Sequence, residues 1–202
     1  MTIAIIDYRA GNLTSVQRAL AHLGCESLIT DDYDTIMGAD KVIFPGVGAA
    51  ASCMQALHET GCGRALADVA AAQIPLLGIC VGMQLLFEHS EEDGGVDCLG
   101  LIPGSVRRFQ PSDPSLKVPH MGWNPIQHDD DPLWLDVPET AAMYFVHSYY
   151  CQPAASVHSM ATSDHGIPFC AGVRHGSIRA VQFHPEKSGP LGLQVLRNFI
   201  NE

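Results

Sequence analysis

The sequence predicts an α/β fold: a mostly parallel central sheet with helices on both faces and antiparallel β additions in the second half. In the first half, short apolar runs alternate with helical patterns, which is typical of a parallel sheet. In the second half, short strand-like segments are separated by proline, glycine and aspartate, which favours antiparallel strands. The 202 residues, 47% of them hydrophobic, suffice for one domain spanning 1–202.

The elements of the first half follow from apolar runs and helical periodicity. Glycines mark where helices stop: Gly24 ends the first, while Gly61 and Gly63 interrupt the second. In chain order we expect strand 3–6, helix 12–23, strand 41–44, helix 49–72, strand 75–79 and helix 83–89.

The second half is expected to be mainly β. Its candidate segments are short and rich in β-branched and aromatic residues, and no linker or internal repeat divides them from the first half. We expect strands 106–109, 142–146, 149–152, 157–162, 169–173 and 178–182, and a final helix 191–200.

Composition excludes several classes of protein. The net charge of −11 argues against a nucleic-acid partner, and no GxxxxGK[ST] phosphate loop is present. No apolar run is long enough to cross a bilayer and the start lacks the pattern of a signal peptide, so we expect a cytoplasmic protein without membrane contact. The seven cysteines form no CxxC pair and the ten histidines no HExxH motif, so we expect reduced thiols, no metal site and no cofactor.

The strongest candidate for chemistry is Cys80. An apolar strand runs into it and a helix follows at once, and Gly78 and Gly82 complete the G-x-nucleophile-x-G spacing of a hydrolase elbow. Glycines permit the crowded, strained turn, and the helix N-terminus favours the thiolate. The amide of Val81 is a candidate oxyanion donor. The alternative is a buried structural cysteine.

A nucleophilic cysteine needs a base, and His184 with Glu186 is the candidate pair. A predicted strand ends at His184, and Pro185 favours extended backbone there. In extended backbone, residues two apart project to the same side, so the carboxylate would orient the imidazole. The alternative is a surface His-Pro-Glu turn.

Four further segments are candidates for a pocket and its surroundings. Glycine-rich 45–48 offers backbone amides as a second oxyanion donor, although an ordinary turn explains it equally well. Gln84 shares a helix face with Cys80, and the acidic run 91–93 offers a carboxylate for a substrate ammonium. The backbone of 147–149 is a candidate pocket wall, and the apolar residues of 119–124 a docking patch. The residues concerned are Gly46, Val47, Gly48, Gln84, Glu92, His147, Ser148, Tyr149, Met121, Trp123 and Asn124.

With these residues in place, the chain resembles the class I glutamine amidotransferases, whose motifs are a cysteine elbow and a late His-x-Glu. Within that family it is most similar to the amidotransferase subunits of imidazole glycerol phosphate synthase. The similar segments run along nearly the whole chain: 5–13, 45–48, 78–87, 100–104, 119–124, 145–149 and 182–188. The chain departs from the family pattern at Ala49–Ser52 and at His165–Gly166.

The resemblance implies a flavodoxin-like sheet and a Cys80–His184–Glu186 triad. Cys80 would attack the side-chain amide of glutamine, giving a thioester and ammonia, and water would release glutamate. Gln84 and Glu92 fall where the family binds glutamine. Segment 45–48 falls at the family's oxyanion strand, which is misaligned until the partner is active.

The same resemblance implies a partner: a cyclase subunit with a (β/α)8 barrel, forming a heterodimer. Ammonia would pass to it and yield imidazole glycerol phosphate and an aminoimidazole carboxamide ribotide, in histidine biosynthesis. Three alternatives remain: an ammonia-supplying subunit of another synthase, such as that for pyridoxal phosphate, a stand-alone cysteine amidase or peptidase, and a binding scaffold that kept the fold.

Overall fold

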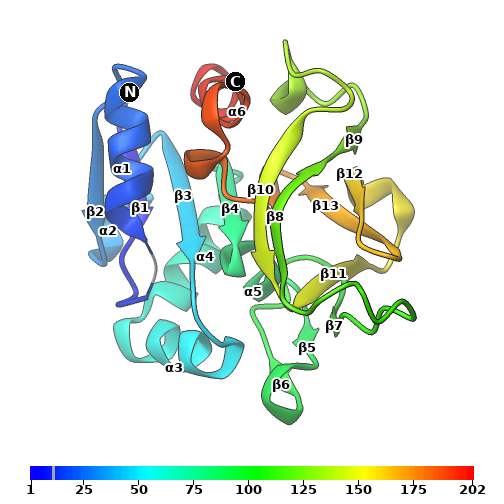
Figure 1. Ribbon diagram of the computed structural model, residues 1–202. Coiled ribbons are helices and arrows are strands. Elements are labelled where there is room, and N and C mark those ends of the chain that lie inside the picture. Colours follow the sequence, from blue (N-terminus) through cyan, green and yellow to red (C-terminus); the bar gives the residue numbers. More distant parts are fainter. Residues whose placement is uncertain (11) are drawn as a thin grey trace.

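The computed structural model describes residues 1–10 and 12–202 and confirms the α/β fold. Gly11, which belongs to the similar segment 5–13, lies outside the described residues. The parallel half of the main sheet has the order β2-β1-β3-β4-β14 (Figure 1). Its members are β2 (Ser27–Thr30), β1 (Ile3–Ile6), β3 (Lys41–Gly46), β4 (Leu76–Cys80) and β14 (Ile178–Val181).

Antiparallel pairing with β14 begins the second half of the same sheet. The order continues β13-β11-β7-β5-β6; off this path, β12 pairs with β13, and β9 pairs with β12. These strands are β13 (Pro168–His175), β11 (Tyr149–Pro153), β7 (Gly104–Arg108), β5 (His89–Ser90), β6 (Val96–Asp97), β12 (Ser159–Asp164) and β9 (Gln127–His128). A separate two-stranded sheet pairs β8 (His120–Pro125) with β10 (Ala142–His147).

Helices cover both faces of the parallel half. In the view of Figure 1, α1 (Leu13–His22) lies in front of β1 and β2, while α4 (Cys62–Ala71) lies behind β3 and β4. The two faces explain why β1, β3 and β4 are buried along their whole length. The other helices are α2 (Tyr33–Met37), α3 (Ala50–Thr60), α5 (Val81–Leu85) and α6 (Gly189–Asn201), with 3-10 turns η1 (Glu92–Gly94), η2 (Pro132–Trp134), η3 (Ser156–His158) and η4 (Pro185–Lys187).

The expected helix 83–89 is wrong in both of its bounds. The helix α5 begins at Val81, directly after Cys80, and ends at Leu85. Carbonyls that would continue the helix accept other partners instead: Leu86 accepts from the amides of Leu101 and Ile102, and Phe87 accepts from Gly100. A distant segment therefore ends the helix early. The short strand β2 was not expected, because its four residues have no alternating pattern and none is buried.

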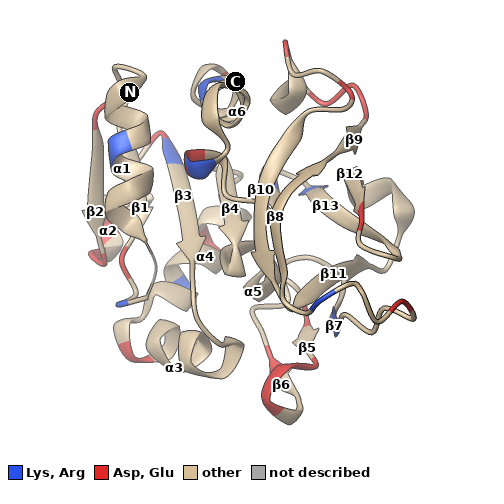
Figure 2. Ribbon diagram, in the orientation of Figure 1, with Lys and Arg blue, Asp and Glu red and all other residues tan. Residues whose placement is uncertain are grey.

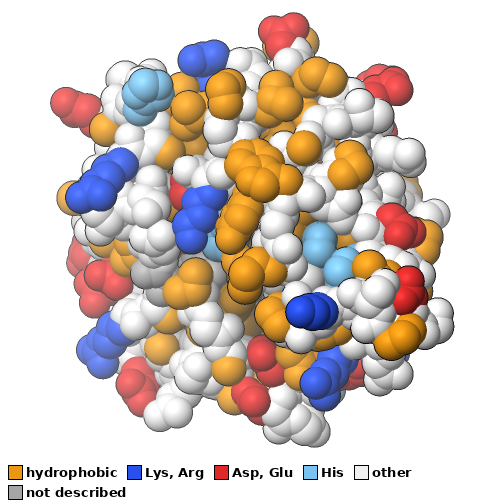
Figure 3. Space-filling model, in the orientation of Figure 1, with side chains coloured by type: hydrophobic (Ala, Val, Ile, Leu, Met, Phe, Trp, Pro, Cys, Tyr) orange, Lys and Arg blue, Asp and Glu red, His pale blue; other side chains and the backbone are white. Residues whose placement is uncertain are grey.

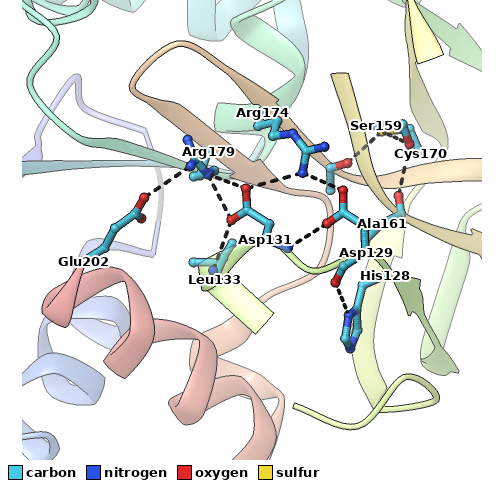
Figure 4. A network of polar contacts seen from close by, with 11 residues as sticks. His128, Asp129, Asp131, Leu133, Ser159, Ala161, Cys170, Arg174, Arg179 and Glu202 are labelled. Carbon is cyan, nitrogen blue, oxygen red and sulfur yellow. Dashed lines mark hydrogen bonds and ion pairs between the residues drawn. The ribbon is translucent and has the colours of Figure 1, made fainter. Parts of the chain in front are cut away.

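An ion-pair network centred on the buried Asp131 joins the sheet to the C-terminal helix (Figure 4). The Asp131 carboxylate, only 2% exposed, pairs with Arg179 at 3.0 Å and with Arg174 at 3.5 Å. Arg179 also pairs with Glu202, next to the end of α6, at 3.2 Å. These contacts help to hold α6 beside β14, from which the chain leads into η4.

Charged side chains lie mostly in loops and on outer elements, whereas β8 and β10 carry none (Figure 2). In the same orientation, hydrophobic side chains form a stripe over the centre of the molecule (Figure 3). Within residues 1–10 and 12–202, no helix is both long and apolar enough to cross a membrane. All seven cysteines are free thiols.

Candidate active site

Cys80 occupies the sharp turn between β4 and α5. Its backbone adopts φ +56° and ψ −113°, a strained conformation for a residue with a side chain. The flanking glycines are sterically required: a Cβ on Gly82 would lie 1.9 Å from the carbonyl oxygen of Phe44, and one on Gly78 would lie 2.9 Å from the Cβ of Ala180. The geometry is that of a nucleophile elbow.

His184 and Glu186 form a buried pair. The Nδ1 of His184 donates to Oε1 of Glu186 at 2.8 Å, and the side chains are 3% and 1% exposed. The expected backbone geometry of this pair was partly wrong. The strand ends at Val181 and does not reach His184, and Glu186 lies in the 3-10 turn η4 and not in extended backbone. His184 itself is extended (φ −98°, ψ 96°), and the turn at Pro185 swings the carboxylate back toward its imidazole.

Ser188 holds this turn in place. Its hydroxyl donates to the carbonyl of His184 at 2.7 Å and accepts the amide of Tyr144 at 2.9 Å. The amide of His184 in turn donates to the carbonyl of Tyr144. His184 is thus held against β10 by contacts that no local sequence pattern predicts.

The electrostatics of the site favour a charged imidazole. Burial opposes protonation of His184, but its interactions with Cys80 and Glu186 outweigh burial and raise its pKa from 6.5 to about 10. A protonated His184 beside Cys80 is the arrangement in which an imidazolium stabilises a thiolate.

Cys80 and His184 open onto one cavity of about 290 Å³, a volume that suits a small molecule. Its wall brings together ten of the residues singled out from the sequence, together with Pro119 and Val146. The ten are Val47, Gly48, Cys80, Val81, Gln84, Glu92, His147, Ser148, Tyr149 and His184.

The glycine-rich segment 45–48 lies beside Cys80. Gly46 is in register with Cys80 across β3 and β4, and a Cβ there would lie 2.6 Å from the Tyr8 hydroxyl and 2.7 Å from the Gly82 nitrogen. Val47 and Gly48 continue along the cavity wall. The thiol of Cys53 donates to the Val47 carbonyl over 3.6 Å, which ties the segment to α3.

The predicted polar residues take different positions around the cavity. Gln84 is 4% exposed, and its amide nitrogen donates to the Tyr149 carbonyl at 3.0 Å. Glu92 accepts the amide of Ala50, the first residue of α3, at 2.7 Å, and burial raises its pKa. His147 is not free to act as a base, because its Nδ1 donates to the Tyr149 carbonyl at 2.7 Å and burial lowers its pKa to about 3.

The three docking-patch residues on β8 do not share one environment. Met121 and Trp123 are 63% and 58% exposed, which is unusual for side chains of this size. Asn124 points its amide inward instead, donating to the carbonyl of Asp164 at 2.7 Å and to His120 at 3.2 Å.

Sequence reasoning missed Gln182, which is fully buried. Its amide nitrogen donates to the Cys80 sulfur at 3.8 Å, and its oxygen accepts from Gln84 at 3.0 Å. A glutamine two residues before a candidate base, at the end of an apolar strand, was the available signal. A buried amide there requires partners.

Comparison with known proteins identifies the family. Residues 4–202 match the model of the class I glutamine amidotransferases. The imidazole glycerol phosphate synthase subunit HisH of Pseudomonas putida is 50% identical over 98% of this chain and 96% of its own. The HisH subunit of Herpetosiphon aurantiacus is 46% identical, over 98% of this chain and 93% of its own.

Solved structures support the fold alone, because their identities are low. A crystal structure of a glutamine amidotransferase aligns with TM-score 0.76 at 17% identity, over 98% of this chain and 97% of that one. The structure of PurLQS from Thermotoga maritima aligns with TM-score 0.73 at 17% identity, over 99% of this chain and 97% of that one. Sequence and fold agree: the chain belongs to the class I glutamine amidotransferases, in the family of the imidazole glycerol phosphate synthase subunits HisH.

Proposed function

We propose that the chain is the glutaminase subunit of an imidazole glycerol phosphate synthase and acts as one amidotransferase domain, 1–202. It hydrolyses glutamine to glutamate and ammonia for histidine biosynthesis. The observation that carries the proposal is the small cavity onto which both Cys80 and His184 open, with Glu186 behind the imidazole. A cavity of about 290 Å³ suits a free amino acid better than a peptide segment.

The proposed reaction begins with attack of the Cys80 thiolate on the side-chain carbonyl of glutamine. The C–N bond then breaks, His184 gives its proton to the leaving nitrogen, and ammonia departs from a thioester. His184 next takes a proton from water, which attacks the thioester and releases glutamate and the thiolate. Glu186 supports the imidazolium throughout.

Charge on the carbonyl oxygen needs donors during both attacks. The amide of Val81, at the N-terminus of α5, and amides of segment 46–48 are the proposed oxyanion hole. Glutamine itself would be held by the rest of the cavity wall: Gln84, Glu92, His147, Ser148 and Tyr149.

The proposed partner is a cyclase subunit with a (β/α)8 barrel, forming a heterodimer over Met121, Trp123 and Asn124. The exposed apolar side chains of β8 and the lack of charge on β8 and β10 support docking there. The partner uses the ammonia to make imidazole glycerol phosphate and aminoimidazole carboxamide ribotide. A cytoplasmic location stays a prediction.

A glutaminase assay of the purified chain, with and without the cyclase and its ligand, tests the proposal. We expect weak activity alone and a strong increase in the complex. Cys80→Ser should abolish glutamine-dependent synthesis by the complex and leave ammonia-dependent synthesis intact. Full glutaminase activity in the isolated chain would refute the coupling, and glutamine-dependent synthesis by Cys80→Ser would refute the nucleophile.

A further inference from the structure

We propose that a chain of buried and half-buried hydrogen bonds positions the Cys80 sulfur and links it to the exposed strand β8. The inference rests on the proposed role of Cys80 as the nucleophile. The chain contains one backbone carbonyl and otherwise side chains; its members in order are Asn124, His120, His147, the Tyr149 carbonyl, Gln84, Gln182 and Cys80.

The end at the nucleophile is made by two buried amides. Gln182 donates its Nε2 to the Cys80 sulfur at 3.8 Å, and its Oε1 accepts from Nε2 of Gln84 at 3.0 Å. Gln84 uses its second N–H on the Tyr149 carbonyl at 3.0 Å. Both amides are thereby oriented, because reversing either would place two donors or two acceptors together. Gln84 keeps only its Oε1 for a substrate, and Gln182 touches the sulfur but lines no part of the cavity.

The two histidines continue the chain in a defined protonation state. The Tyr149 carbonyl only accepts, so Nδ1 of His147 carries the proton over the 2.7 Å contact. In the neutral ring Nε2 of His147 must then accept, so Nδ1 of His120 donates to it at 3.0 Å. Nε2 of His120 accepts in turn from the Asn124 amide at 3.2 Å. These three bonds point from β8 toward the Tyr149 carbonyl, which accepts a second hydrogen bond from Gln84 on its other side.

The surroundings keep both rings neutral. Burial, with smaller effects from neighbouring histidines, lowers the pKa of His120 to about 4 and that of His147 to about 3. The aromatic rings of Phe109, Phe145 and Phe169 pack around the pair, and His165 stacks on His120 with ring centres 4.3 Å apart.

The end of the hydrogen-bond chain on β8 lies beside the exposed side chains of Met121 and Trp123. Asn124 is the next residue after Trp123, and its amide also donates to the carbonyl of Asp164. His120 and His147 face each other in register across β8 and β10, so the histidine bond moves with this two-stranded sheet. A partner that shifts β8 therefore shifts the support of the Tyr149 carbonyl and, through the two amides, of the sulfur.

The first experiment measures the positioning of Cys80 without glutamine. Iodoacetamide alkylation of Cys80 at pH 7 is followed by mass spectrometry of its peptide in the wild type, in Gln182→Met and in the matched control Gln55→Met. Gln55 is an exposed residue whose amide bonds only to Glu59 among the described residues. We expect Gln182→Met to alkylate roughly tenfold more slowly, since it loses a hydrogen bond to a charged sulfur, and Gln55→Met to match the wild type.

Glutaminase kinetics in the presence of the cyclase then separate positioning from substrate binding. Gln182→Met should lower kcat by roughly tenfold with KM within about threefold, because Gln182 lines no part of the cavity. If folded Gln182→Met equals the wild type in alkylation and kcat, the inference is overturned. If the wild type alkylates as expected but never hydrolyses glutamine, the proposed function fails while the positioning of the sulfur stands.

Imidazole NMR of the wild type tests the histidine section without any variant. In ¹⁵N-labelled protein, His120 and His147 should both remain neutral and protonated on Nδ1 from pH 8 to pH 5. Either ring titrating near its ordinary value of 6.5, or carrying its proton on Nε2, would overturn the inference. This measurement keeps the inference falsifiable should Gln182→Met fail to fold.

Discussion

His184, which precedes the 3-10 turn η4, and Glu186, which lies in it, are joined by a 2.8 Å hydrogen bond, and both side chains are almost completely shielded from solvent. The carboxylate orients the imidazole and favours its protonated form. We expect Glu186→Gln to lower kcat for glutamine by about 100-fold or more, because a neutral amide cannot stabilise the imidazolium. Steady-state kinetics check this, with the exposed Glu59→Gln as the control. Equal kcat in the two variants would remove Glu186 from the mechanism.

Glycine is required at position 82 for packing, not for flexibility. A Cβ there would overlap the Phe44 carbonyl at 1.9 Å, and a backbone atom cannot swing away. We expect Gly82→Ala to lower the free energy of unfolding by at least about 2 kcal/mol in urea denaturation. Gly63→Ala, within helix α4, is the matched control, because a Cβ on Gly63 would have no neighbouring atom closer than 3.5 Å. This variant should leave the free energy of unfolding unchanged or slightly higher. Equal stability of Gly82→Ala and the wild type would contradict the crowded elbow.

The neutral histidines predict how stability depends on pH. Burial lowers the pKa of His120 from 6.5 to about 4 and that of His147 from 6.5 to about 3. Above pH 6.5 both rings are neutral in the folded and unfolded states, and the free energy of unfolding is unaffected by them. As the pH falls below 6.5, the free energy of unfolding decreases, because the two histidines take up protons in the unfolded chain but not in the folded one. We expect stability to fall with pH between about pH 6 and pH 4, by at most about 1.4 kcal/mol per pH unit for each histidine.

Urea unfolding at several pH values measures that slope. His120→Phe keeps an aromatic ring among its neighbours and removes one titrating group, so its slope should be shallower. His58→Phe changes an exposed histidine and should keep the slope of the wild type. An unchanged slope in His120→Phe would mean that His120 is not held neutral by the fold.

Glu92 combines a structural contact with a proposed role in substrate binding. It accepts the amide that begins α3, and Gln at this position keeps an oxygen for that contact. We expect Glu92→Gln to raise KM for glutamine by roughly tenfold with little change in kcat, because the charged partner of the substrate ammonium is lost. Since burial raises the pKa of Glu92, KM of the wild type should also rise at mildly acidic pH. The neighbouring exposed Asp93→Asn should change neither, and a normal KM in Glu92→Gln would place the ammonium elsewhere.

The exposed indole of Trp123 predicts the energetics of docking. We expect Trp123→Ala to weaken the complex with the cyclase by about 2 kcal/mol, measured by titration calorimetry. Val157→Ala removes a similarly exposed apolar side chain on η3 and should leave the affinity unchanged. Unchanged affinity in Trp123→Ala would place the interface on another face.

The residues of the proposed active site could be singled out from the sequence because they lie in two short local motifs. Gly78, Cys80 and Gly82 form the elbow within five residues, and His184 and Glu186 lie within three. The strands β1, β3 and β4 in the first half also follow from local sequence, since each is built almost entirely of apolar residues.

Only the tertiary structure decided which side chains meet over long separations. Gln182 lies 102 residues from Cys80, and His120 lies 27 residues from His147, so neither contact leaves a local pattern. The end of α5 and the turn that brings Glu186 to His184 are likewise set by distant partners, the amides of 100–102 and the hydroxyl of Ser188. Periodicity and spacing report how a segment folds on itself, whereas hydrogen bonds between segments depend on how the strands come together.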